Sequence, residues 1–232
     1  MISEMFAHGF IQRAFIGGVL VSLCAALLGV SLVLKRYSMI GDGLSHVSFG
    51  ALSIAIAFGF APIKFSIPIV IIAAFFLLRL AENGKMKSDA AIAMVSASSL
   101  AIGVIVTSLT TGLSTDVCSY MFGSILAMSK DDVIFSVVLS VVVLIMFGFC
   151  YHRIFAVTFD ESFSKATGVK VGMYNTLISI FTAVTVVLGI KMMGAMLISS
   201  LIIFPALTSM RVFKSFLSVT ICSAILAVIN FT

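Results

Sequence analysis

The chain has 232 residues, of which 61% are hydrophobic and only 10% are charged, and its mean hydropathy is +1.27. Soluble globular domains are closer to half apolar and a quarter charged. The composition therefore excludes a soluble globular domain and predicts an all-α polytopic membrane protein, because helices satisfy their own backbone hydrogen bonds in lipid. The net charge of +5 does not indicate nucleic-acid binding, since membrane proteins collect Lys and Arg in cytoplasmic loops.

Apolar segments of spanning length follow one another along the chain and predict a helix bundle with about seven or eight transmembrane helices in one domain, 1–232. In chain order the segments are 14–34, 40–60, 63–80, 90–110, 133–151, 172–190, 192–210 and 215–231. The sixth and seventh are nearly fused at Lys191, which leaves open whether one of them is broken or re-entrant. Pro205 removes a backbone donor from the seventh segment and predicts a helix kink.

Basic residues divide unequally between the two ends of these segments. Ten fall on one side, namely Lys35, Arg36, Arg79, Lys85, Lys87, Arg153, Lys165, Lys170, Arg211 and Lys214, and four fall on the other, namely Arg13, Lys64, Lys130 and Lys191. By the positive-inside rule the richer side is cytoplasmic. This orientation places the N-terminus outside.

Small residues recur every fourth position in two of the segments. The first stripe is Ala14, Gly18, Ser22 and Ala26, and the second is Ala93, Ala97 and Ala101. Such stripes let helix backbones approach closely in lipid, where no hydrophobic effect drives association. Both stripes are therefore expected to pack inside the bundle. The longer segment between the fourth and fifth spans holds the apolar run 121–126, which predicts a short helix dipping toward the membrane.

Asp42 and His46 are the most informative polar residues, because they lie four positions apart inside the second apolar segment. On a helix this spacing places both side chains on one face, with Cβ atoms about 5–6 Å apart. A carboxylate oxygen and an imidazole nitrogen on one face are typical of half a site for a divalent transition metal. An ionised group at the bilayer centre costs roughly 2.5–3.5 kcal/mol on insertion scales, so a function is expected for the pair.

Two interpretations of the pair remain open from the residues alone. In one, Asp42 pairs with Lys35 or Arg36 near the interface and His46 only packs. In the other, a single helical stripe runs from Asp42 through His46 to Ser53 and lines a path into the span. Two ligands do not complete a tetrahedral site, but a two-fold dimer would supply two Asp and two His.

The segment 158–169 predicts a short amphipathic helix of two or three turns. Thr158 and Asp160 are the candidate N-caps, acids occupy the first turn, and Gly168 is the expected end. The helix is either an interfacial connector or a docking element for a soluble partner protein. No Gly-x-x-x-x-Gly-Lys-Ser/Thr phosphate-binding loop occurs in the chain. The chain is therefore not expected to be an enzyme that hydrolyses ATP by itself.

Five motifs then occur in a familiar order. They are Leu34–His46, with its basic pair followed by Gly-Asp-Gly-Leu-Ser-His; Ser88–Ala93; Ser119–Leu126; Phe159-Asp160-Glu161 with Ala166 and Gly168; and Gly194–Leu197 through Pro205-Ala206. This series resembles the membrane permease subunits of bacterial ATP-binding-cassette importers for zinc, manganese or iron. The resemblance covers nearly the whole chain.

The resemblance implies a homodimeric, multi-pass permease of the bacterial inner (cytoplasmic) membrane, with its translocation path at the dimer interface. Two cytoplasmic ATPase subunits would dock on it and hold the ATP, and an extracytoplasmic metal-binding protein would deliver the ion. No cofactor is expected to be bound permanently. By resemblance, Asp42 and His46 form the transient metal site. The ATPase-coupling contact would comprise Phe159, Asp160, Glu161, Ala166 and Gly168.

An oxygen–nitrogen ligand pair suits zinc, manganese and ferrous iron; zinc is the first expectation, and manganese or iron the second. The alternative function is a self-sufficient proton-coupled metal carrier or channel built on Asp42 and His46. Dependence of transport on ATP separates the two.

Two features depart from the family pattern. Gly43 stands where Ala is usual, and it is expected to loosen the helix start between the two ligands. The sequence stops at Thr232, where family members usually continue into at least one further apolar segment.

Overall fold

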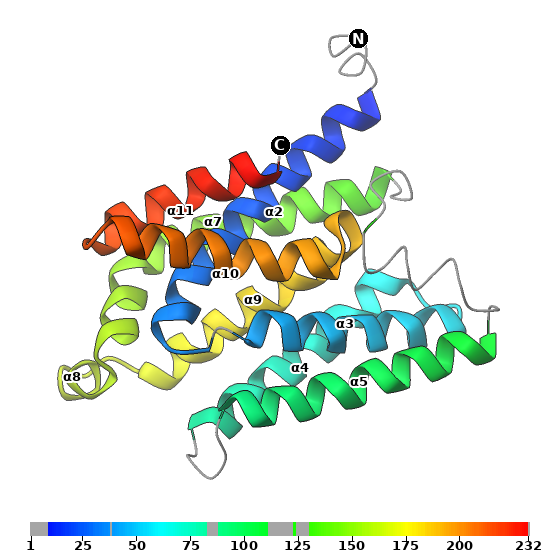
Figure 1. Cartoon of the computed structure of the whole chain (residues 1–232), viewed down its shortest axis with the longest axis horizontal. Helices are drawn as coiled ribbons and strands as arrows, with labels where there is room; N and C mark the ends of the chain where they lie inside the picture. The colour runs from blue at the N-terminus through cyan, green and yellow to red at the C-terminus, as the bar shows by residue number, and fades with distance from the viewer. Residues whose placement is uncertain (1–8, 38, 83–87, 111–122, 124–129, 232) are drawn as a thin grey trace.

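The computed structural model describes residues 9–37, 39–82, 88–110, 123 and 130–231, and every regular element within these ranges is a helix (Figure 1). The helices are α2 (Gly9–Leu34), α3 (Ile40–Ala57), α4 (Pro62–Glu82), α5 (Ser88–Thr110), α7 (Lys130–Phe159), α8 (Glu161–Ala166), α9 (Val171–Met193), α10 (Ala195–Val212) and α11 (Phe216–Phe231). The eight apolar segments of the sequence each form one long helix, and the 158–169 segment forms α8. The all-α fold is confirmed.

Six helices are long and apolar enough to cross a membrane, judged by length and composition: α2, α3, α5, α7, α9 and α10. Two more, α4 and α11, contribute shorter apolar stretches, Pro62–Leu77 and Phe216–Phe231. Helices α9 and α10 are separated only by Gly194, whose φ of +87° is a conformation that glycine adopts at little cost. Because both helices reach spanning length, the sixth and seventh segments form two full-length helices.

Helix α2 occupies the centre of one part of the bundle and packs against α7, α9, α10 and α11 (Figure 1). Its small residues allow this, as the first stripe predicts. A Cβ added to Gly18 would meet the ring of Phe231, and a Cβ added to Gly29 would meet the carbonyl oxygen of Ile202. Ala26 is fully buried. Close backbone approach is thus possible only without side chains at these glycines.

Helices α3, α4 and α5 form the other part, with α5 at the outer edge beside α3 (Figure 1). The prediction that Ala93, Ala97 and Ala101 pack inside the bundle is wrong for the single chain, because all three are exposed. The face of α5 that meets α3 carries Gly103 instead. A Cβ there would lie 2.6 Å from the ring of Phe49.

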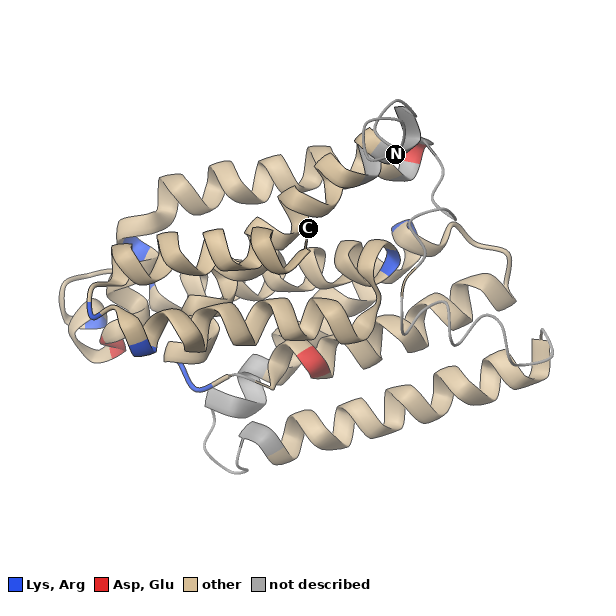
Figure 2. Cartoon of the chain, turned by 45° about the horizontal axis from the view of Figure 1, so that its top comes forward, with Lys and Arg blue, Asp and Glu red and all other residues tan. Residues whose placement is uncertain are grey.

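Helix α7 continues to Phe159, eight residues beyond the predicted end at 151. His152 and Arg153 suggested an end because they are polar. Their neighbours Ile154 and Val157 are nevertheless fully buried, so packing carries the helix past the polar pair. Lys and Arg residues gather at the two ends of the bundle (Figure 2). The short helix expected at 121–126 lies outside the described residues, except for Gly123.

Candidate metal site and coupling segment

Asp42 and His46 lie on adjacent turns at the start of α3. Helix α3 begins after Met39, and Asp42 falls in its first turn, where the helix dipole favours negative charge. The Nε2 atom of His46 lies 3.7 Å from Oδ2 of Asp42, and the two side chains are 30% and 42% exposed respectively. The predicted spacing therefore brings a nitrogen and an oxygen together on one half-buried face.

The pair borders a cavity of about 530 Å³ between α3 and α5, lined by Met39, Asp42, His46, Ile92, Ala93, Ser96, Ala97 and Leu100. Most of its wall is hydrocarbon. The hydroxyl of Ser96 donates to the carbonyl of Ile92 at 2.8 Å, which leaves the lone pairs of the serine oxygen for other contacts. Within the described residues, no third His, Cys, Asp or Glu joins the pair.

The interpretation that Asp42 pairs with Lys35 is wrong. The ammonium of Lys35 instead contacts Glu161, at 2.7 Å. The cause is the turn between α2 and α3, which directs Lys35 toward α8 and Asp42 toward α5.

The polar stripe from Asp42 through His46 to Ser53 does not form an open path in this structure. Ser53 is 5% exposed, donates to the carbonyl of Phe49 and accepts a hydrogen bond from Thr107 of α5. Phe49 is also buried, against Gly103. The stripe is therefore closed by α3–α5 packing one turn beyond His46.

Gly43 has a different consequence from the looser helix start that the sequence predicts. A Cβ at this position would lie 2.5 Å from Cγ2 of Ile92 and 3.2 Å from Oγ of Ser96. The glycine therefore lets α5 approach α3 between the two candidate ligands. Packing gives a physical reason for glycine here, and the looser helix start stays a prediction.

The turn joining α2 to α3 is short, and its described residues Arg36 and Tyr37 are hydrogen-bonded back to α2. The N–H of Tyr37 donates to Leu32 and the N–H of Arg36 donates to Val33, the pattern of a Schellman motif. Arg36 takes the left-handed position, at φ 62°. That conformation costs an L-residue other than glycine about 1–2 kcal/mol, so the surrounding contacts must hold the turn in place.

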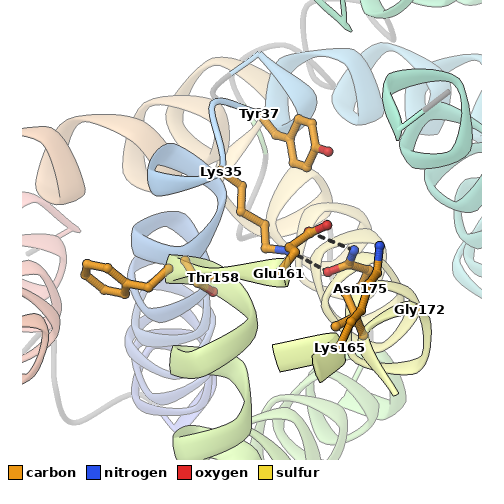
Figure 3. A pocket seen from close by; sticks show the side chains of 9 residues that line it. Lys35, Tyr37, Thr158, Glu161, Lys165, Gly172 and Asn175 are labelled. Carbon is orange, nitrogen blue, oxygen red and sulfur yellow. Dashed lines mark hydrogen bonds and ion pairs between the residues drawn. The ribbon is translucent and has the colours of Figure 1, made fainter. Parts of the chain in front are cut away.

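Lys35 closes a three-sided polar cluster with Glu161 and Asn175 (Figure 3). Its Nζ donates to Oε1 of Glu161 at 2.7 Å and to Oδ1 of Asn175 at 2.5 Å. The amide of Asn175 donates to the same Glu161 oxygen at 3.1 Å. The cluster borders a second cavity, of about 550 Å³, which is also lined by Tyr37 and Lys165. The Lys35–Glu161–Asn175 cluster connects the end of α2 to α8 and α9.

The pKa of Glu161 is lowered from its ordinary value by this cluster. Partial burial acts in the opposite direction and would raise it. Hydrogen bonds from Lys35 and Asn175, together with the positive charges of Lys35 and Lys165, outweigh burial. Glu161 is therefore held as a carboxylate.

Helix α8 has well-defined ends. Asp160 is its N-cap, in extended conformation, and its carboxylate accepts from the N–H of Phe163 at 2.9 Å. Gly168, at φ +81°, follows the C-cap, and the N–H of Val169 returns to the carbonyl of Ser164 at 2.9 Å. The expected cap and end are both present. The helix has six residues, shorter than the two or three turns predicted, because α7 continues to Phe159 and α8 begins only after Asp160.

Four of the five residues predicted to contact an ATPase are exposed, namely Phe159 (60%), Asp160, Ala166 and Gly168. The exposed carboxylate of Asp160 also caps α8. The carboxylate of Glu161 is partly buried against Lys35. Phe163, 65% exposed, was not among the predicted contacts although it belongs to the same segment. The signal for it is a large apolar ring within a short helix of otherwise polar or small residues.

Pro205 lies buried inside α10, where it removes one backbone hydrogen-bond donor. The helix kink that the sequence predicts at this residue stays a prediction.

Residues 7–232 match the ABC 3 transport family. The chain belongs to this family. Two similar proteins are described by transport function. A probable metal transport system membrane protein of Treponema pallidum is 30% identical over 227 residues, 97% of this chain and 85% of that protein. The high-affinity zinc uptake system membrane protein ZnuB of Buchnera aphidicola is 31% identical over 219 residues, 94% and 84% of the two chains.

The manganese import system permease protein ScaB of Streptococcus gordonii is 28% identical over 217 residues, 94% of this chain and 78% of that protein. Among solved structures, PsaBC from Streptococcus pneumoniae in complex with Fab has a TM-score of 0.84 and 27% identity, and the match covers 99% of this chain and 84% of that one. As a member of the ABC 3 transport family, this chain is a multi-pass membrane permease.

Proposed function

We propose that the chain is the permease subunit of an ATP-binding-cassette importer that moves a divalent transition metal into the cytoplasm across the bacterial inner membrane. The observation that carries this proposal is the pair of Asp42 and His46 beside the α3–α5 cavity. Membership of the ABC 3 family and the zinc and manganese transport named for its relatives support it.

The geometry of the pair suits an ion in transit. Two ligands at about 2.0–2.2 Å from a tetrahedral ion lie about 3.3–3.6 Å apart. The nitrogen and oxygen of His46 and Asp42 lie 3.7 Å apart, so a small movement brings both to one ion. With two strong ligands in a chain, the ion remains under-coordinated and can leave. Zinc is the first candidate, and manganese or iron the second, since all three accept oxygen and nitrogen.

A second copy of the chain is proposed to form the other wall of the metal path. Asp42 and His46 remain partly exposed, and the cavity wall includes the exposed small residues Ala93 and Ala97. Small residues on an outer helix face suit close packing against another helix in lipid. A two-fold dimer across this face would place two Asp and two His around one path.

Helix α8 is proposed to receive the ATPase subunit. The exposed rings of Phe159 and Phe163 offer an apolar contact next to the polar ends of the helix. ATP hydrolysis is assigned to that partner, and an extracytoplasmic metal-binding protein is proposed to deliver the ion. The basic end of the bundle, which carries Lys35 and Lys165, faces the cytoplasm in this arrangement.

Metal uptake by cells tests the site. Asp42→Asn removes the anionic ligand with little change of shape, so uptake should fall to background while the amount of protein in the membrane is unchanged. Asp131→Asn is the matched control, because Asp131 is an exposed acid at the start of α7. Unchanged uptake by the Asp42 variant, or equal loss in both variants, would contradict the assignment.

A further inference from the structure

Lys35 is a buried cation placed between the coupling segment and the candidate metal site. Its side chain is only 6% exposed, although it follows the last residue of α2. It donates to Glu161 of α8 and to Asn175 of α9, and Asn175 donates back to Glu161 (Figure 3). The ammonium group of Lys35 thus links the end of α2 to α8 and to α9 through hydrogen bonds.

The chain leads directly from Lys35 to the metal pair. Tyr37 is bonded back to the end of α2, and the N–H of Ile40 at the start of α3 donates to the carbonyl of Tyr37 at 3.0 Å. Asp42 is in the first turn that follows. A displacement of Lys35 is therefore transmitted through a short, hydrogen-bonded turn to the first of the two ligands.

The other side of the cluster belongs to α8. Glu161 is the first residue of that helix, immediately after the Asp160 cap, so its carboxylate moves with the helix as a unit. Lys35 is almost completely buried, whereas the carboxylate of Glu161 is 37% exposed. A partly solvated ion pair contributes little net stability, so Glu161 can change its partner at little cost.

The cluster also has the means to rearrange. Lys165 lies one turn after Glu161 on α8, at the spacing that favours a Glu–Lys pair, and it borders the same cavity. Glu161 can therefore exchange Lys35 for Lys165 without losing a cationic partner. The adjoining cavity of about 550 Å³ leaves room for this movement.

We propose that Lys35 is a positioning residue that couples movement of α8 to the start of α3, and so to Asp42 and His46. This inference rests on the proposed function, because it requires an ATPase that moves α8. Lys35 contacts neither metal nor ATP in this arrangement. Its bond to Glu161 sets the position of the α2–α3 turn in one state and releases it in the other.

The test is the amount of metal transported per ATP hydrolysed, in vesicles that contain the chain and its ATPase. Lys35→Met keeps the aliphatic length and removes the charge. It should lower the ratio at least about fivefold, the lower end of typical coupling effects. Glu161→Gln should lower it too, and the double variant should be no worse than the more impaired single variant. Binding of the ATPase, measured by pull-down, separates lost coupling from lost docking.

Arg36→Met is the matched control, because Arg36 is the neighbouring cation on the same turn and is exposed. It should keep the ratio within about twofold of wild type. A normal ratio for Lys35→Met, or an equal fall for Arg36→Met, would overturn the positioning role. Absence of ATP-dependent uptake by the wild type would contradict the proposed function instead.

Hydrogen exchange of residues 39–46 gives a second readout, and its first comparison uses the wild-type protein alone. In the wild-type complex, a non-hydrolysable ATP analogue should change exchange at the start of α3. In Lys35→Glu this response should be lost, and it should return in the double charge swap Lys35→Glu with Glu161→Lys. No response in the wild type, or no return in the swap, would overturn the inference.

Discussion

Glu161 is the residue whose charge depends most clearly on the fold. Its pKa is lowered because the bonds from Lys35 and Asn175 outweigh its partial burial. A group with a lowered folded pKa stabilises the fold fully above its unfolded pKa, about 4.3 for Glu, and loses that contribution as pH falls through the folded value. The carboxylate side chain is 37% exposed, so solvent keeps the effect small.

The thermal stability of the purified chain should accordingly fall less steeply with acid when Glu161 is replaced by Gln. The comparison runs from about pH 6 to about pH 3, below the unfolded pKa of Glu. The glutamine has no proton to gain, whereas wild type loses its charged bond to Lys35. Melting temperatures measured in one detergent across this range test the expectation. Equal acid sensitivity of the two proteins would show that the cluster contributes nothing to stability.

Residue-scale prediction from sequence succeeded where the partners are close in the chain. Asp42 and His46 share a helix face because four positions make about one turn, and Asp160 caps α8 because Phe163 is three residues away. The partners of Lys35 lie 126 and 140 residues away, and only the packing of α2 and α8 against α9 brings them together. No local pattern distinguishes that contact from a pairing with Asp42.

At the scale of elements, the N-cap of α8 offers a direct test. Asp160→Ala removes the acceptor for the N–H of Phe163, and losing such a cap costs about 0.5–2 kcal/mol. Asp160→Asn keeps an acceptor of the same reach and should retain the helix. Protease cleavage between α7 and α9 should therefore be faster for the alanine variant than for wild type or the asparagine variant. Equal cleavage of all three would exclude the cap as a determinant of α8.

Close helix packing predicts opposite effects for two glycines. Gly29→Ala would direct a methyl group at the backbone of Ile202, and overpacking of this kind costs about 1–3 kcal/mol. Nothing lies within 4 Å of a Cβ added to Gly148, in the middle of α7. Gly148→Ala should be neutral or stabilising by up to about 1 kcal/mol, because Ala favours helix. Thermal unfolding in detergent tests both, and a Gly29 variant as stable as wild type would contradict the close α2–α10 contact.

Helix positions were predictable because each apolar segment is long enough to form one helix, and polar or glycine residues separate them. Helix faces were predictable only in part. Gly18, Ser22 and Ala26 of the stripe on α2 pack inward. Ala93, Ala97 and Ala101 on α5 face outward. A stripe of small residues predicts close packing without saying which chain provides the other helix.

At the scale of the whole molecule, the outward face of α5 is the region where a second copy is proposed to pack. In that case Ala97→Cys should give disulfide-linked dimers under mild oxidation in membranes. Phe149→Cys, which replaces an 84% exposed ring in the middle of α7, should not exceed the background from native cysteines. Gel electrophoresis without reductant measures both variants. Cross-linking at Phe149 but not at Ala97 would place the interface elsewhere.

Composition and hydropathy were sufficient for the class of molecule, because a chain that is 61% hydrophobic can fold only where lipid or other helices cover its surface. The motif series then predicted the family, which the match over residues 7–232 confirms. The direction of transport, the metal and the number of copies are functional properties of an assembly, so one chain's pattern could only suggest them.

Uptake of radioactive zinc and manganese into membrane vesicles most directly tests whether the chain is part of an ATP-driven metal importer that uses Asp42 and His46. The vesicles would contain the chain with its ATPase, with or without ATP on the ATPase side, and either wild-type chain or His46→Ala. We expect uptake that requires both ATP and His46, with zinc preferred over manganese. Uptake without ATP would indicate a self-sufficient carrier, and ATP-dependent uptake that survives loss of His46 would place the metal path elsewhere.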